Sequence, residues 1–156
     1  MKKVDQIDFE ILSLLQEDAR MSYSAIARHV HLSVTAVTSR IQRMEDDQVL
    51  TGFRAQINGD HVGLRVHGFI LAGAWQIKLD AVHDYLATLP EVVRVETIIS
   101  GGKELLIEFY CADMDALMKF YESGLRDYLE TMTVYLVKDP PAKNSGLPLS
   151  LSAKVF

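Results

Sequence analysis

The sequence has one cysteine, four prolines and no long apolar run. A single cysteine cannot form an internal disulfide or a cysteine metal cluster. Because Cys111 lies in an apolar segment, we expect it to be a buried, unreactive thiol. The longest apolar stretch, residues 66–75, contains His67 and glycines and is shorter than the roughly 18 residues of a membrane span. The first ten residues lack the apolar core of a signal peptide. These absences predict a cytoplasmic protein with no membrane partner.

Groupings of residues that carry catalysis are also missing. The sequence shows no Ser/His/Asp spacing, no cysteine beside a base and no glycine-rich phosphate loop, and its five histidines are scattered. His29 and His31 flank a short break between two helical segments, but metal binding would require a third ligand. We therefore expect no enzyme activity, no metal site and no cofactor.

Positive charge is in the minority, with 16 Lys and Arg against 21 Asp and Glu and a net charge of −5. The distribution is more informative than the sum. Residues 20–44 contain four arginines and no acid, whereas the segments on either side are acidic. Such a window can form a surface for phosphates, but chance clustering on a solvated surface explains the charges equally well.

The first 47 residues predict three helices. Apolar residues at three- and four-residue steps predict a helix over 4–19, a shorter one from about residue 22, and a third over 33–47. Asp5 is a candidate N-cap for the first helix, with Asp8 three residues later. Ser22 or Ser24 can cap the second helix and Ser33 the third, because a side-chain oxygen accepts a hydrogen bond from the first-turn amides.

The third helix presents two different faces. Its apolar residues form one stripe, composed of Val34, Val37, Ile41 and Met44. The opposite face has short polar groups and one long basic group: Thr35, Thr38, Ser39, Gln42 and Arg43. Such a face suits base edges and phosphates. An ordinary solvated face is the alternative, although such faces usually mix lysine with glutamate.

A short hairpin is expected after the third helix. Residues 49–57 are typical of two short strands around Gly52, with Phe53 and Ile57 packed inward. Three helices followed by a hairpin indicate a winged helix-turn-helix. The turn at 58–61 is the natural boundary, so we assign residues 1–60 to a DNA-binding domain.

The second half predicts a different architecture. Strands are expected at 66–75, 91–100, 103–112 and 131–139, and helices at 78–90 and 113–129. The order βαββαβ is that of a ferredoxin-like fold, with both helices on one face of a four-stranded sheet. Residues 61–140 thus form a second domain, residues 141–156 an irregular tail, and the chain an α+β protein. Phe69 and Leu71 fall on the uncovered face, which predicts a sheet-to-sheet dimer.

The N-terminal motifs resemble those of the Lrp/AsnC (feast/famine) family of prokaryotic regulators. An aspartate-flanked helix is followed by a first block at Arg20, Ser22, Ile26 and Ala27. The second block comprises Leu32, Ser33, Val37, Arg40, Ile41, Met44, Glu45, Val49, Leu50, Gly52 and Phe53. The βαββαβ half resembles the amino-acid-sensing domain of the same family, so the resemblance extends to about residue 138.

The resemblance implies a transcription regulator that binds double-stranded DNA. The third helix, beginning at Ser33, would enter the major groove, and base contacts are expected from Thr35, Thr38, Ser39 and Gln42. Phosphate contacts are expected from Arg28, Arg40, Arg43 and Arg54. Arg40 has an alternative role, because it can pair with Glu45 or with an acid of the first helix. A dimer would bind two half-sites about one helical turn apart, and family members also form tetramers or octamers.

The resemblance also implies a small amino-acid effector bound between subunits. We expect it near the turn and strand start formed by Ser100, Gly101, Gly102 and Glu104, where glycine amides can approach a carboxylate. Taken alone, the two glycines are more typical of a tight hairpin. Two positions depart from the family pattern, since Gln48 replaces a common glycine and Glu104 a common aspartate. An effector-independent, DNA-organising protein is therefore the alternative function.

Overall fold

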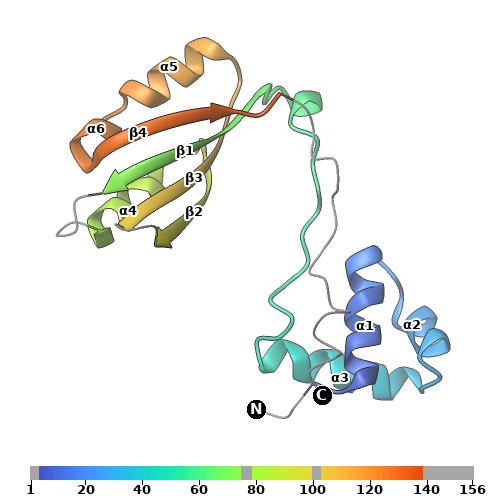
Figure 1. The fold of residues 1–156 in the computed structure, drawn as a ribbon. Coiled ribbons are helices and arrows are strands. Elements are labelled where there is room, and N and C mark those ends of the chain that lie inside the picture. The colour runs from blue at the N-terminus through green and yellow to red at the C-terminus, as the bar shows by residue number, and fades with distance from the viewer. Residues whose placement is uncertain (1–3, 75–78, 100–102, 139–156) are drawn as a thin grey trace. The chain divides into compact units, whose positions relative to one another are not determined.

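The computed structural model describes residues 4–74, 79–99 and 103–138 (Figure 1). The chain divides into two compact units, with the break between Gln56 and Ile57. The break lies a few residues before the turn at 58–61 that the sequence suggests as a boundary.

The N-terminal unit contains the three expected helices, α1 (Gln6–Glu17), α2 (Tyr23–His29) and α3 (Val34–Asp46). Asp5 caps α1 in a capping box, in which its side chain accepts from the Asp8 amide and the Asp8 side chain accepts from the Asp5 amide. Ser22, rather than Ser24, caps α2, and Ser33 caps α3. All three helices therefore begin where short polar side chains satisfy free backbone amides.

The three helices share one apolar core. Its buried members come from all three: Ile11, Leu12, Leu15, Ile26, Ala27, Val30, Val37, Ile41 and Met44. Three residues of the predicted α3 stripe are thus confirmed as core. The fourth, Val34, is the first residue of the helix and is 45% exposed.

The predicted strands of the wing are absent. Residues 51–58 form no strand, Phe53 is 45% exposed and Ile57 is 73% exposed. A two-stranded hairpin is marginal unless further strands or a helix cover one of its faces, and both side chains are exposed. The third helix ends without glycine, and Gln48 adopts the left-handed conformation with φ of 55°.

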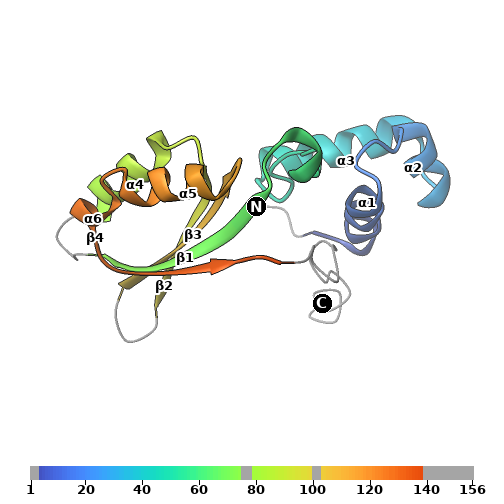
Figure 2. The ribbon, with the colours of Figure 1, turned by 90° about the horizontal axis from the view of Figure 1, so that it is seen from above.

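The C-terminal unit has the predicted ferredoxin-like fold. Its strands are β1 (Val66–Ala74), β2 (Val92–Ile99), β3 (Lys103–Cys111) and β4 (Leu129–Leu136), which pair antiparallel in the order β2-β3-β1-β4. Its helices are α4 (Leu79–Thr88), α5 (Met114–Glu122) and α6 (Leu125–Tyr128), preceded by a 3-10 turn, η1 (Asp60–Val62). Figure 2 shows all three α-helices of this unit on one side of the sheet. The single helix expected over 113–129 is divided, because Gly124 turns the chain with φ of 94°.

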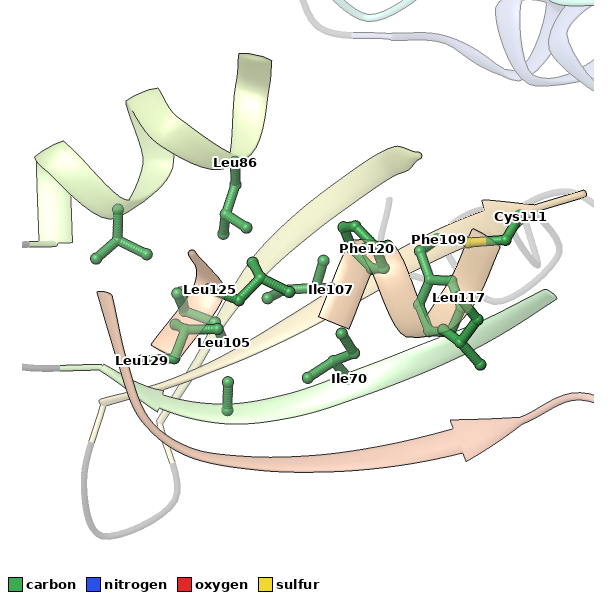
Figure 3. Close-up of a cluster of buried hydrophobic side chains, with 12 residues drawn as sticks. Ile70, Leu86, Leu105, Ile107, Phe109, Cys111, Leu117, Phe120, Leu125 and Leu129 are labelled. Atoms are coloured by element: carbon green, nitrogen blue, oxygen red, sulfur yellow. The ribbon is translucent and has the colours of Figure 1, made fainter. Parts of the chain in front are cut away.

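The core of this unit lies between the sheet and the helices (Figure 3). Alternate residues of β3 point into it, among them Leu105, Ile107 and Phe109, all fully buried. Cys111 continues this row, and burial raises the pKa of its thiol, with Glu91 and Asp113 acting in the same direction. The expected burial of this thiol is thus confirmed.

Candidate nucleic-acid interface

One face of α3 is exposed because the opposite face is core. Val37, Ile41 and Met44 are fully packed against α1 and α2, so residues one or two positions away point outward. The exposed set is the one that the sequence predicts for base contacts: Thr35, Thr38, Ser39 and Gln42. The same residues line a shallow hollow of ≈ 630 Å³, together with Val34, Arg43 and Asp46. The geometry therefore brings the predicted base-contacting residues together on one surface.

Side chains on this face already make contacts within the helix. The Thr38 hydroxyl donates to the Val34 carbonyl at 2.9 Å, and the Gln42 amide donates to the Asp46 carboxylate at 3.1 Å. The Ser33 hydroxyl accepts from the Ala36 amide in the helix cap. Asp46 was missed in the sequence analysis, although a residue four positions after Gln42 lies on the same helix face.

Arg40 and Arg43 bind acids of α1. Arg40 Nη1 lies 2.7 Å from Asp5 Oδ2 and 2.8 Å from Asp8 Oδ1, and Arg43 Nη2 lies 2.5 Å from Asp8 Oδ2. The Asp8 side chain is completely buried, whereas those of Arg40 and Arg43 are 24% and 30% exposed. A buried carboxylate needs such partners, because an uncompensated charge in the interior is strongly destabilising. The alternative that Arg40 pairs with an acid of the first helix is the arrangement found.

The same contacts shift two pKa values. The hydrogen bonds from Arg40 Nη1 to Asp5 and Asp8 raise the pKa of Arg40. Partial burial acts to raise the pKa of Asp5, but the hydrogen bonds from Arg40 and the Asp8 amide outweigh it and lower the pKa. Both groups are therefore held in their charged forms, and this cluster ties α3 to α1.

The other two predicted phosphate contacts are on the surface. Arg28 is exposed in the last turn of α2, and Arg54 is exposed in the extended segment that follows α3. Neither arginine forms an ion pair with any residue that the structure describes. Their predicted contact with DNA phosphates stays a prediction, as does that of Arg40 and Arg43.

Only one of the four predicted effector residues, Glu104, is among the described residues. Ser100, Gly101 and Gly102 lie outside the described residues. Glu104 is half-buried near the start of β3, where it pairs with Gly73 of β1 and Ile98 of β2. Strand alternation places it on the side of β3 shared with Leu106 and Glu108, which is the face without helices.

A polar cluster that the sequence did not reveal occupies one part of that open face. Glu108 accepts from His67 Nε2 at 3.0 Å through one oxygen, and its other oxygen forms an ion pair with Arg94 Nε at 3.3 Å. The His67 ring stacks on Tyr110, with 4.1 Å between centroids and 7° between planes. Burial, followed by the charge of Glu108, raises the pKa of Tyr110. These residues come from three strands, so only the sheet register could have revealed the cluster.

Comparison with known proteins identifies the family. A model of the AsnC-type helix-turn-helix domain matches residues 4–45. An HTH-type transcriptional regulator of Pyrococcus horikoshii is 36% identical over 118 residues, which cover 76% of this chain and 74% of that protein. The chain belongs to the Lrp/AsnC family of transcription regulators.

Solved structures agree with the fold of this Lrp/AsnC regulator. An AsnC family transcriptional regulator from Agrobacterium tumefaciens is 26% identical and superposes with a TM-score of 0.82, covering 94% of this chain and 98% of that one. A transcriptional regulator from Neisseria meningitidis, solved as a complex with L-Met, is 24% identical with a TM-score of 0.84, covering 96% and 99%. The predicted combination of a helix-turn-helix and a ferredoxin-like domain is thus confirmed.

The comparisons also establish the general function. This Lrp/AsnC protein is a DNA-binding transcription regulator. Its relatives are named as transcription regulators, which favours regulation over the DNA-organising alternative. The same names point to regulation rather than to catalysis. None of the helices in the described ranges is long and apolar enough to cross a membrane.

Proposed function

We propose that this regulator binds its operator as a dimer joined through the open face of the ferredoxin-like sheet, and that a small amino acid held between subunits modulates binding. One observation is the main support for the proposed dimer. Helices α4, α5 and α6 cover one face of the sheet (Figure 2), whereas none of the described helices of residues 57–138 covers the other, which the segment at Gly59 approaches only beside Tyr110. The centre of that open face is apolar and contains Phe69, Leu71 and Leu106.

Physical reasons favour burial of this face. Contiguous exposed apolar surface on a soluble domain commonly marks an interface. A unit of this size has a large surface relative to its core and gains stability from a partner. The side chains of Phe69, Leu71 and Leu106 are only half-buried within one chain. A second copy placed face to face by a two-fold axis would remove the same patch from water on both chains.

Such a dimer would present two copies of α3. The operator is then expected to contain two half-sites about one helical turn, or a multiple of it, apart. Further assembly into tetramers or octamers, as the family resemblance implies, would extend the contact over more half-sites.

The amino-acid effector is supported by position and by a structural neighbour. Glu104 lies on the open-face side of β3, next to the proposed interface, and Ser100, Gly101 and Gly102 immediately precede that strand in sequence. The Neisseria meningitidis regulator was solved with L-Met. An effector that binds between subunits would favour one assembly over another, and its effect on DNA binding follows by linkage.

Two substitutions at positions of similar exposure test the dimer. Tyr135 on the open face is 54% exposed and Met118 on α5 is 51% exposed, so neither supports the core of one chain. Tyr135→Glu would place two charges in the interface, whereas Met118→Glu would place a charge in solvent. Sedimentation should show a weakened dimer for Tyr135→Glu and an unchanged one for Met118→Glu. An intact dimer in both variants, or a loss in both, would overturn the proposed interface.

A thermal-shift screen against the twenty amino acids, each at millimolar concentration, tests the effector. A ligand that binds only the folded protein at 100 times its Kd adds about 2.7 kcal/mol to the free energy of unfolding. We expect a shift with one or a few chemically related amino acids, and a smaller shift for Glu104→Gln. No shift with any amino acid would remove the effector from the proposal and leave the dimer to its own test.

A further inference from the structure

We propose that Gln42 is the specificity-determining residue of α3, that it selects adenine at one base pair of each half-site, and that Asp46 orients its amide for this contact. The inference rests on DNA binding through the exposed face of α3. It adds an assignment of which side chain reads a base, which base it selects, and which neighbour positions it.

The two arginines of α3 are poorly placed to read bases. Guanine is usually recognised by a long cationic side chain, most often arginine, that donates to its O6 and N7. Arg40 and Arg43 instead donate to Asp5 and Asp8 at 2.5–2.8 Å. Release of either arginine would withdraw a partner from the fully buried Asp8 carboxylate. Both arginines are therefore positioning residues that act through α1.

The remaining exposed face of α3 is uncharged along most of its length. Thr35, Thr38 and Ser39 each offer a single hydroxyl oxygen, and the Thr38 hydroxyl already donates to the Val34 carbonyl. Gln42 alone on this face carries a separate donor and acceptor on one planar group. The edge of adenine in the major groove presents an N7 acceptor and an N6 donor, which a glutamine amide matches with two hydrogen bonds.

Asp46 fixes the orientation of the Gln42 side-chain amide. Gln42 Nε2 lies 3.1 Å from Asp46 Oδ1. An ionised carboxylate can only accept hydrogen bonds, so the nitrogen rather than the oxygen of the amide must face it. One N–H is used in this contact, and the second N–H and Oε1 are left for a base.

The position of Asp46 does not favour the helix itself. Asp46 is the last residue of α3, where the negative end of the helix dipole disfavours an acid. An acid at the edge of a DNA-binding face also repels phosphates. Asp46 thus lowers affinity for DNA in general while it orders the group that distinguishes one base from another, which is an expected cost of specificity.

Selection of binding sites from short duplexes of random sequence tests the proposal with the full chain. Wild type should enrich an adenine at one fixed position of each half-site. Gln42→Ala should retain the rest of the motif but lose about ten- to hundredfold in preference at that base pair. Asp46→Ala should weaken the same preference and bind random DNA more tightly. The exposed Gln16 of α1 provides a matched control, since Gln16→Ala should leave the motif unchanged.

The outcomes separate this inference from the proposed function. An unchanged motif in Gln42→Ala would overturn the role of Gln42, while DNA binding by the protein would stand. The wild-type motif could instead lack adenine and contain a guanine that Arg43→Gln no longer selects. That result would assign base reading to Arg43 rather than to Gln42. Failure of the wild type to bind any duplex would contradict DNA binding itself. Equal thermal midpoints of wild type and Gln42→Ala are expected, because the side chain is exposed.

Discussion

Removal of the Asp8 carboxylate should destabilise the N-terminal unit more than any change of an exposed acid. Asp8 is fully buried, accepts from both Arg40 and Arg43, and accepts from the Asp5 amide in the capping box. Hydrogen bonds to charged groups contribute about 1.5–3 kcal/mol each, and breaking a buried pair costs about 3–5 kcal/mol. Because both arginines remain partly exposed to water, we expect Asp8→Ala to cost about 3 kcal/mol, at the lower end.

Urea and thermal unfolding measure this cost. In a unit of this size a loss of about 3 kcal/mol lowers the Tm by roughly 12–24 °C. Glu10→Ala, which changes an exposed acid on the same helix, should stay within about 0.5 kcal/mol of wild type. A double-mutant cycle with Arg43→Gln should show a coupling free energy above about 0.5 kcal/mol, as expected for residues in one network. A loss below about 1 kcal/mol for Asp8→Ala, or strictly additive effects in the cycle, would refute the reasoning.

Three further predictions concern backbone conformation, packing and pH. Gln48→Gly should raise the free energy of unfolding by about 1 kcal/mol, because residue 48 has φ of 55° after α3 and left-handed backbone disfavours side chains; thermal unfolding checks this. Gly68→Ala should cost about 2 kcal/mol in urea unfolding, since a Cβ there would lie 2.6 Å from Phe109 Cζ and from the Tyr135 carbonyl oxygen. Stability should fall on acidification below about pH 4, because Asp5 has a lowered pKa in the folded state and stabilises it only when ionised.

Matched variants separate these effects from unrelated losses. Gly63→Ala should lower the free energy of unfolding by less than Gly68→Ala does. Although Gly63 has φ of 86°, nothing lies within 4 Å of an added Cβ there. Asn is a good N-cap, so Asp5→Asn should keep the helix start and flatten the acid-dependent loss of stability. A Gln48→Gly variant no more stable than wild type would mean that tertiary contacts already offset the backbone strain.

The sequence predicts those features of the fold that depend on near neighbours in the chain. The N-caps at Asp5 and Ser33 and the apolar stripe of α3 are local patterns, and the structure contains both caps and three of the four stripe residues in the core. The order βαββαβ is likewise readable from alternation and helical periodicity. The missing wing strands differ because Phe53 and Ile57 have the right residue types for strands, but a hairpin needs a third element to cover one face.

Features that depend on distant residues were only partly predictable. Asp8 and Arg43 are separated by 35 residues, so the sequence offered several acids as partners and could not choose among them. The cluster of His67, Arg94 and Glu108 needs the register of three strands. In contrast, the pairing of Gln42 with Asp46 spans one helical turn and was within reach of sequence reasoning.

The arginine–aspartate cluster also changes what the charge distribution means. Residues 20–44 contain four arginines and no acid, which would allow a cationic DNA-binding surface if all four were free. Two of these four, Arg40 and Arg43, are neutralised by acids of α1. Each phosphate contact makes the slope of log affinity against log salt more negative by about 0.9. We expect Arg28 and Arg54, which form no ion pair with any described residue, to contribute more to this slope than Arg40 and Arg43. A helix whose exposed face is largely neutral must then obtain its discrimination from base contacts, which is where Gln42 lies.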